Sequence, residues 1–214
     1  MTERKTPMEK RYDKLGPTVV EALKKRRFDA YYCQTAGEAL QQVLELIPKG
    51  DVVAWGGSET MQETGILDAV KDRYEVIDRD TAASPEERGE LMRRALTSDT
   101  FLMSSNAITE DGQLFNIDGN GNRCAALVFG PKSVIVVAGM NKVVKTVADA
   151  QSRARNIAAP LNAQRFDIST PCSVTGACAD CTSPDCICAS LVHTRISKPP
   201  KKIKVVLIGE DYGM

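Results

Sequence analysis

Five cysteines crowd into residues 172–188 in the spacing C-x5-C-x2-C-x4-C-x-C. Thiolates at this density favour a soft cation, because soft sulfur ligands bind zinc and iron–sulfur clusters well. A zinc ribbon has two C-x2-C pairs separated by a loop of roughly 12 or more residues, whereas this segment has one such pair. The compact spacing is nearer to a 4Fe–4S site, and zinc remains the alternative. The candidate ligands are Cys172, Cys178, Cys181, Cys186 and Cys188.

A second chemical signal is the segment DVVAWGGSET at residues 51–60, where an apolar run ends in two glycines and a serine before a helical pattern. Glycine has no Cβ to block a ligand, and the backbone N–H groups at the start of a helix favour negative charge. Gly56, Gly57 and Ser58 therefore predict a site for a small organic anion. The alternative is a plain strand-to-helix turn in which Ser58 is the N-cap.

Polar residues in later turns are further candidates for the same ligand. Amides and cations of this kind bind carboxylates and phosphates, although polar turn residues also occur without any ligand. Glu110 is a candidate catalytic carboxylate, and the alternative for it is a solvated residue of a hairpin turn. The candidate ligand-binding residues beyond the glycine loop are Asn106, Asn120, Asn122, Arg123, Asn141 and Lys142.

The length and charge of the chain limit its organisation and partners. A chain of 214 residues predicts one domain over residues 1–214, with an N-terminal helical segment at 1–27 and a cysteine-rich metal- or cluster-binding segment at 169–190. The 28 basic residues balance 28 acidic ones, so no global field attracts nucleic acid. No stretch approaches the roughly 20 apolar residues of a membrane helix.

The N-terminal sequence MTERKTPMEKRYDK is charged and lacks the apolar region of a secretory signal. This predicts a cytoplasmic protein, whose thiols are kept reduced. Metal binding then explains the cysteines better than disulfides do.

Helical and strand-like patterns alternate in the first half of the chain. Such alternation predicts right-handed crossovers and a parallel sheet covered on both faces. The predicted helices cover residues 13–27, 35–47 and 84–97, with a further helical face at Ile66, Leu67 and Val70, and the predicted strands cover 28–33, 51–55 and 74–77.

The pattern changes at residue 99. Four strand-like runs follow with short turns rich in Gly, Asn and Asp between them, which predicts antiparallel or hairpin-like pairing. A helical stripe over 143–157 is expected to end near Pro160, and a last strand at 203–209 is expected to return to the sheet after the cysteine excursion. The four runs are residues 100–103, 113–117, 124–129 and 133–138.

Several motifs, in order along nearly the whole chain, resemble the lactate-utilisation (LUD) domain family, in its short form with a C-terminal cysteine cluster. The matching segments are AWGGSET, SSNAITEDGQLFNIDGNGNR, FGPKSVIVVAGMNKVV, ARNIAAPLN, TPCSVTGACADC and VLIGEDYG. The resemblance implies an α/β fold similar to ribose-5-phosphate isomerase, glucosamine-6-phosphate deaminase and the CoA transferases. That fold has a three-layer α/β core with a mixed, mainly parallel sheet.

The resemblance also implies a function and a ligand set. It implies a subunit or accessory protein of an iron–sulfur-dependent system that oxidises L-lactate to pyruvate, with protein partners in that system. It implies the cluster spacing C-x5-C-x2-C-x6-C, which selects Cys172, Cys178, Cys181 and Cys188 and leaves Cys186 as the alternative ligand. In related sugar-phosphate enzymes the first glycine-rich turn holds phosphate, at the position of Gly56 to Ser58.

Two other functions remain open. Glu110 falls on the position of the CoA-transferase glutamate that attacks a thioester, which implies a freestanding CoA-transferase-like or sugar-phosphate-isomerase-like enzyme. The other is a non-catalytic, metal-stabilised partner-binding protein. The chain has no G-x-G-x-x-G fingerprint for a nicotinamide or flavin cofactor, so an oxidoreductase subunit of this kind would pass its electrons to a cluster or a partner.

Overall fold

The computed structural model describes residues 5–214, and within them a six-stranded sheet forms the centre of the fold. All its strand pairs are parallel, in the order β1-β10-β7-β4-β2-β3. The mainly parallel α/β architecture predicted from the sequence is confirmed. The strands are β1 (Asp29–Cys33), β2 (Val52–Trp55), β3 (Glu75–Ile77), β4 (Thr100–Met103), β7 (Ser133–Gly139) and β10 (Ile203–Ile208).

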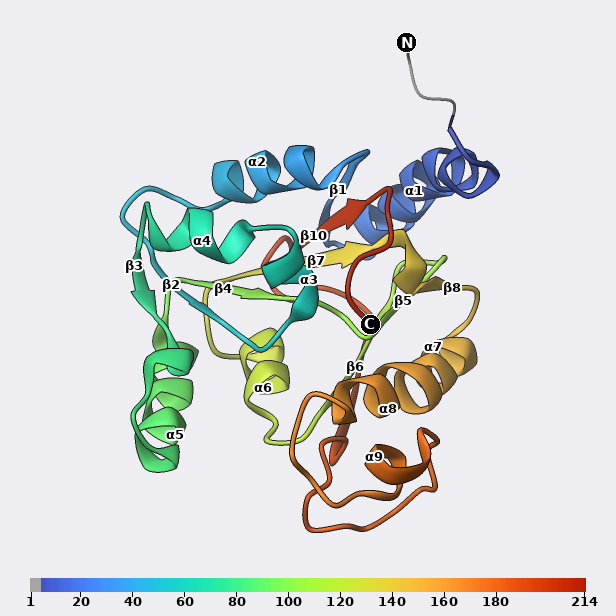
Figure 1. The fold of residues 1–214 in the computed structure, drawn as a ribbon. Coiled ribbons are helices and arrows are strands. Elements are labelled where there is room, and N and C mark those ends of the chain that lie inside the picture. The colour runs from blue at the N-terminus through green and yellow to red at the C-terminus, as the bar shows by residue number, and fades with distance from the viewer. Residues whose placement is uncertain (1–4) are drawn as a thin grey trace.

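Helices cover both faces of this sheet, and alternate strand residues face each layer. In β7, Val134 and Val136 join the core under α1 (Pro7–Lys25) and α6 (Asn122–Val128). Ile135 and Val137 join the opposite core, under α2 (Ala36–Leu46), α3 (Glu59–Glu63) and α4 (Ile66–Lys71). Figure 1 shows α2 and α4 over one face and α6 over the other. The period of two along a strand thus produces the three layers.

The first helix is longer than predicted. It begins at Pro7 rather than near residue 13, because Thr6 and Glu9 form a capping box that satisfies its first N–H groups. Residues 1–4 of the predicted N-terminal segment lie outside the described residues. Within residues 5–214, no helix combines the length and apolarity that crossing a bilayer requires.

A smaller sheet lies beside the first, in the order β8-β5-β6-β9. Its hairpin of β5 and β6 turns at residues 110–112 and is antiparallel, as is the pairing of β6 with β9. The prediction of antiparallel pairing is wrong for β4 and β7, which lie side by side in the parallel sheet because α6 crosses between them. The strands of the smaller sheet are β5 (Ala107–Thr109), β6 (Leu114–Asp118), β8 (Val143–Val144) and β9 (Ser190–Thr194).

The predicted strand at 124–129 is wrong, because this run is the helix α6. The Asp118 carboxylate accepts hydrogen bonds from the backbone N–H groups of Gly121 and Cys124 and so caps the helix. One face of α6 is buried, whereas Phe129 just beyond it is 87% exposed. A short apolar run does not distinguish a buried strand from a one-sided helix.

The predicted helix over 143–157 is also corrected. Residues 143–144 form β8, and the helical part comprises α7 (Val147–Arg153), a π-helical segment (Ala154–Ala158) and α8 (Ala159–Ala163). Pro160 does not end it, and the helical run continues from the π-helical segment through Pro160 to Ala163. The remaining helices are α5 (Pro85–Arg94) and α9 (Pro171–Thr175), with 3-10 segments at Arg79–Thr81, Ala95–Thr97 and Met140–Lys142.

The cysteine-rich segment runs between α8 and β9, and β10 then returns to the sheet between β1 and β7, as expected. Pairing of β9 with β6 draws the end of this segment against the loop that follows β6. There, the backbone of Ile187 lies so close to Gly119 that an added Cβ would be 3.0 Å from the Ile187 Cα.

Candidate functional site

A cavity of about 480 Å³ opens at the edge of the large sheet where its parallel strands end. Gly57 and Ser58 follow β2, Arg79 follows β3, Ser104 follows β4 and Lys142 follows β7, and all of them line the cavity. The carboxyl ends of parallel strands are the usual place for ligands in open α/β sheets. The fold itself therefore collects these side chains.

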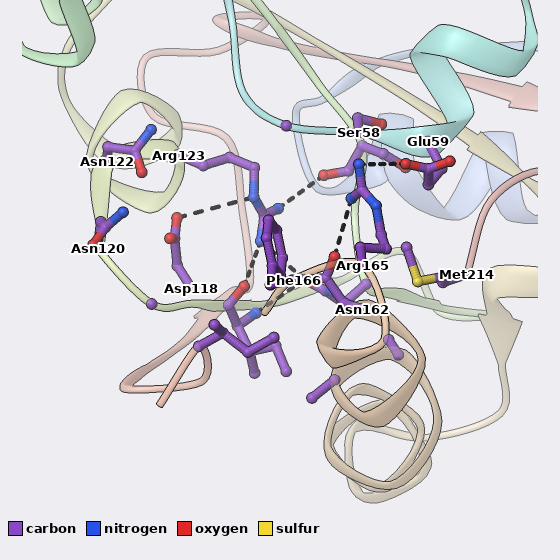
Figure 2. A pocket seen from close by; sticks show the side chains of 18 of the residues that line it. Ser58, Glu59, Asp118, Asn120, Asn122, Arg123, Asn162, Arg165, Phe166 and Met214 are labelled. Atoms are coloured by element: carbon purple, nitrogen blue, oxygen red, sulfur yellow. Dashed lines mark hydrogen bonds and ion pairs between the residues drawn. The ribbon is translucent and has the colours of Figure 1, made fainter. Parts of the chain in front are cut away.

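The opposite wall comes from the smaller sheet, the helices beside it and the cysteine segment. Figure 2 shows Asp118, Asn120, Asn122 and Arg123 on one side, Asn162 and Arg165 on the other, and Phe166 between them in this view. Arg165 forms an ion pair with Glu59 across the cavity and donates to Asn162. The wall is completed by Pro184, Asp185, Cys186 and Ile187.

Arg79 occupies the floor beside the glycine loop. Its Nη2 lies where a side chain on Gly57 would begin, 2.5 Å from the position of an added Cβ. Within residues 5–214 its buried Nε has no hydrogen-bond acceptor, and the nearest carboxylate oxygen, on Asp80, is 3.7 Å away. Burial lowers the pKa of Arg79, and the charge of Asp80 opposes this. The guanidinium thus has donors that the protein does not use.

Arg123, by contrast, uses its donors within the protein. Its Nη1 donates to the Ser104 carbonyl at 3.0 Å and to Asn116 Oδ1 at 2.7 Å, and its Nη2 donates to Asn106 Oδ1 at 3.0 Å and to the Ile117 carbonyl. Its side chain also fills the space beside Gly56, where an added Cβ would be 2.9 Å from Arg123 Cδ. Arg123 therefore joins the two sheets, and Gly56 leaves room for it.

Lys142 is a buried amine at the end of β7, with 4% of its surface exposed. Its Nζ donates to Thr60 Oγ1 at 2.8 Å and to Ser104 Oγ at 3.1 Å. Burial, aided by the positive charges of Arg153 and Arg123, lowers the pKa of Lys142 to about 7, and Glu63 opposes the shift. No carboxylate in the described part of the chain forms an ion pair with it.

The structure brings together most of the predicted ligand-binding residues but not all. Gly56 and Asn141 lie outside the cavity lining, and Asn141 instead binds the backbone of Tyr212 and Gly213. Glu110 is likewise outside it, in the hairpin turn, where its carboxylate accepts from Lys145 Nζ at 2.6 Å. The predicted residues that do line the cavity are Gly57, Ser58, Asn106, Asn120, Asn122, Arg123 and Lys142.

Sequence reasoning missed the arginines Arg79, Arg88 and Arg165 of the cavity lining. Arg79 had a usable signal, because it comes two residues after a predicted strand, at the end where ligands bind. Arg165 had none, because it reaches the cavity only through the placement of α8.

The five clustered cysteines are free thiols, each partly exposed. Cys186 and Cys188 have their sulfurs 3.4 Å apart, and Arg155 Nη2 lies 3.6 Å from the sulfur of Cys178. Burial raises the pKa of Cys188 to about 12, assisted by Cys186 and by the charges of Cys178 and Cys181. These four thiols are therefore electrostatic neighbours.

Two observations bear on whether these residues suit a metal group. The donor set is soft and reduced, which fits zinc or an iron–sulfur cluster. Within residues 5–214, however, no three His, Cys, Asp or Glu side chains are arranged as metal ligands. The thiols are of a type that binds these metal groups, and several lie near one another. To coordinate a metal together, their sulfurs would have to move closer to one another. Cys186 also lines the cavity, so the cysteine segment and the glycine loop border the same cavity.

A family profile and one solved structure agree with this architecture. The sequence profile described as the LUD domain matches residues 17–208. A DUF162 family protein from Deinococcus radiodurans has a similar structure, with a TM-score of 0.54, 13% identity, and coverage of 92% of this chain and 98% of that one. Ribose 5 phosphate isomerase A from Neisseria gonorrhoeae aligns with a TM-score of 0.33 and 14% identity, over 53% of this chain and 56% of that one. A comparison with curated proteins found no match.

Proposed function

The chain belongs to the LUD domain family, which is linked to lactate utilisation, and from this premise we propose that it binds a small organic anion in the cavity at the carboxyl ends of β2, β3, β4 and β7. We propose further that it does so as a subunit of an iron–sulfur-dependent system that oxidises L-lactate to pyruvate. The observation that carries the anion site is Arg79, a cavity-lining guanidinium with unused donors over Gly57.

The charges around the cavity support a carboxylate ligand. Asp80 is engaged by Arg88, and Glu59 by Arg165, so these carboxylates already have cationic partners. The carboxylate paired with Arg79 is that of Asp80, 3.7 Å from Nε, and Asp80 is shared with Arg88. A planar carboxylate ligand would suit the fork of the Arg79 guanidinium. The α3 helix has only five residues, so its dipole contributes less than the loop sequence alone suggests.

We expect Arg79→Gln to weaken binding of lactate or pyruvate by roughly tenfold to a hundredfold, because a charge-assisted hydrogen bond contributes about 1.5–3 kcal/mol. Calorimetric titration of the purified protein measures the dissociation constant. Gly57→Ala should weaken binding too, since its Cβ would lie 2.5 Å from Arg79 Nη2 and displace the guanidinium.

Arg94→Gln is the matched control, because Arg94 is exposed near the end of α5 and does not line the cavity. It should bind as the unchanged protein does. Equal affinity of the Arg79 and Arg94 variants, or no binding by the unchanged protein of any of several small carboxylates, would contradict the anion site.

The cysteine segment is the proposed holder of the iron–sulfur cluster. Cys172, Cys178, Cys181 and Cys188 are the proposed ligands, with Cys186 as the alternative. When bound, a 4Fe–4S cluster supplies one-electron transfer to a partner. The residues of this chain would hold it beside the cavity wall, and Arg155 would place a positive charge next to Cys178.

We expect protein purified without oxygen to contain stoichiometric iron and sulfide, and Cys181→Ser to lose most of both. Cys33→Ala should retain them, because Cys33 is buried in β1 and is remote in sequence from the cluster segment. Elemental analysis and the visible charge-transfer absorption are the readouts. Zinc in place of iron would support the alternative metal, and the absence of any metal would refute the metal-binding role.

A further inference from the structure

Lys142 is a buried amine in the cavity for which simple anion binding leaves no specific role. We propose that Lys142 forms an imine with the carbonyl carbon of a 2-oxo acid held in the cavity. The inference rests on the proposed anion site, because that site would hold the carboxylate of such a molecule. It assigns Lys142 a covalent role and narrows the ligand from organic anions to 2-oxo acids.

The hydrogen bonds around Lys142 suit a neutral amine. Ser104 Oγ is placed to donate to Thr60 Oγ1, and Thr60 Oγ1 to the Tyr212 carbonyl, each at 3.4 Å. With the hydroxyl protons directed in this way, both oxygens accept from Lys142 Nζ. A neutral amine has two N–H donors, which the two hydroxyls satisfy, and a lone pair that remains free. An ammonium would have a third donor and a charge to neutralise.

The charges near Lys142 act in the same direction. Arg153 and Arg123 disfavour a third positive charge, and both are fixed by backbone carbonyls: Arg153 donates to Asn106 at 2.6 Å and Arg123 to Ser104 at 3.0 Å. Among residues 5–214, Glu63 is the acidic side chain that acts on Lys142, and its carboxylate accepts from the backbone N–H of Gly213 at 2.7 Å. Because a nucleophilic amine must be unprotonated, this environment maintains the reactive form near neutral pH.

Two other lysines show that burial or position alone does not create this environment. Lys202 is also buried, but its Nζ donates to the carbonyls of Leu127 and Phe129 and does not line the cavity. Lys145 is exposed and paired with Glu110, which raises its pKa. Lys142 combines burial, hydroxyl partners and a place in the cavity wall, and these are the conditions for a reactive amine in contact with a ligand.

The ligand class follows from placing two functional groups in one cavity. Arg79 would bind a carboxylate, and Lys142 would attack a carbonyl carbon. Both groups line the same cavity, so a small molecule that carries a ketone next to its carboxylate would meet both. A 2-hydroxy acid has the carboxylate but no carbonyl, so it would bind without reacting at Lys142.

The chemistry requires no external oxidant or reductant. The Nζ lone pair forms a bond to the carbonyl carbon while the C=O π electrons move to oxygen, which takes up a proton. The nitrogen loses a proton, and the carbinolamine then expels its hydroxyl as water while the C=N bond forms. Amine and ketone thus become imine and one water, and hydrolysis reverses the step.

The test is reductive trapping on the full-length protein at neutral pH. The protein is incubated separately with pyruvate, 2-oxobutyrate and 2-oxoglutarate, treated with borohydride and mapped by peptide mass spectrometry. Borohydride reduces the imine to a stable secondary amine, so pyruvate would leave a carboxyethyl group on the lysine. Lactate under the same conditions is the non-carbonyl control.

We expect the adduct at Lys142 to exceed that at Lys145 by roughly a thousandfold. The neutral fraction of an amine falls tenfold per pH unit below its pKa, and the pKa is lowered to about 7 for Lys142 but raised for Lys145. Lys142→Arg, checked for folding by circular dichroism, should lose the adduct, whereas Arg94→Gln, outside the cavity lining, should keep it. A higher adduct yield at the exposed Lys145 than at the buried Lys142 would overturn the proposal. Measured binding of 2-oxo acids without any adduct would overturn the imine and leave the anion site intact, whereas absence of binding would overturn both.

Discussion

Replacing Gly112 by alanine is expected to lower the free energy of unfolding by more than about 3 kcal/mol. Gly112 ends the β5–β6 hairpin turn with φ +85°, in the left-handed region that favours glycine. A Cβ there would lie 2.6 Å from the Ala22 carbonyl carbon and the Leu23 nitrogen, in the last turns of α1, where Leu23 is fully buried. Backbone atoms of a packed helix cannot move aside as a flexible side chain would, so the clash would separate α1 from the hairpin.

Gly65→Ala is the matched control for this prediction. Gly65 also has a left-handed φ, +69°, but nothing lies within 4 Å of its added Cβ. Gly65→Ala should therefore lower the free energy of unfolding by only about 1–2 kcal/mol, which is the conformational penalty of alanine with a left-handed φ. Urea unfolding of the three proteins gives the comparison, and equal losses for the two variants would mean that contact with α1 is not what makes Gly112 necessary.

The second large effect concerns pH. We expect the free energy of unfolding to rise between about pH 7 and pH 10, because Lys142 titrates at different pH values in the folded and unfolded states. Its pKa in the folded protein is lowered to about 7 by burial and by Arg153 and Arg123, with Glu63 opposing, whereas an unfolded lysine titrates near 10.4. Between these values the unfolded chain binds the extra proton, so raising the pH favours the folded state. The charged lysine therefore costs stability fully below pH 7, and the cost disappears above the unfolded pKa.

The size of this effect is on the order of 5 kcal/mol, from about 1.36 kcal/mol for each unit of pKa difference. Lys142→Met should remove this slope, which is measured as the difference between the stability–pH curves of the two proteins. The other lysines and the tyrosines titrate in both proteins, so their contributions cancel when one curve is subtracted from the other. Lys145→Met, at an exposed lysine, should retain the slope of the unchanged protein. Parallel curves for the unchanged protein and Lys142→Met would show that Lys142 remains charged when folded.

The structure joins two features that lie far apart in the sequence. Gly57 and Ser58 of the glycine loop and Cys186 of the cysteine segment line one cavity. This contact arises because β9 pairs with β6 and carries the end of the cysteine segment to the loop after β6. An anion in the cavity and a cluster held by the cysteines would consequently be neighbours.

Most of the framework was predictable because its signals are local. The alternation of apolar stripes with short apolar runs identified the parallel strands, and Thr35 and Ser84 marked helix starts that the structure confirms. The errors occur where local patterns are ambiguous. The run at 124–129 is apolar enough for a strand, and only the distant cap from Asp118 and the one-sided burial make it a helix.

The sequence by itself determined the residue types of the site: a glycine loop after a strand, a dense set of thiols and a lysine after a late strand. Only the tertiary structure decided which of them meet. It placed Arg79 over Gly57, used Arg123 as a link between sheets, and left Glu110 in a hairpin turn with Lys145. The reason is physical: residue type fixes what a side chain can bond, whereas its partners depend on strand order and helix placement, which bring together residues distant in the chain.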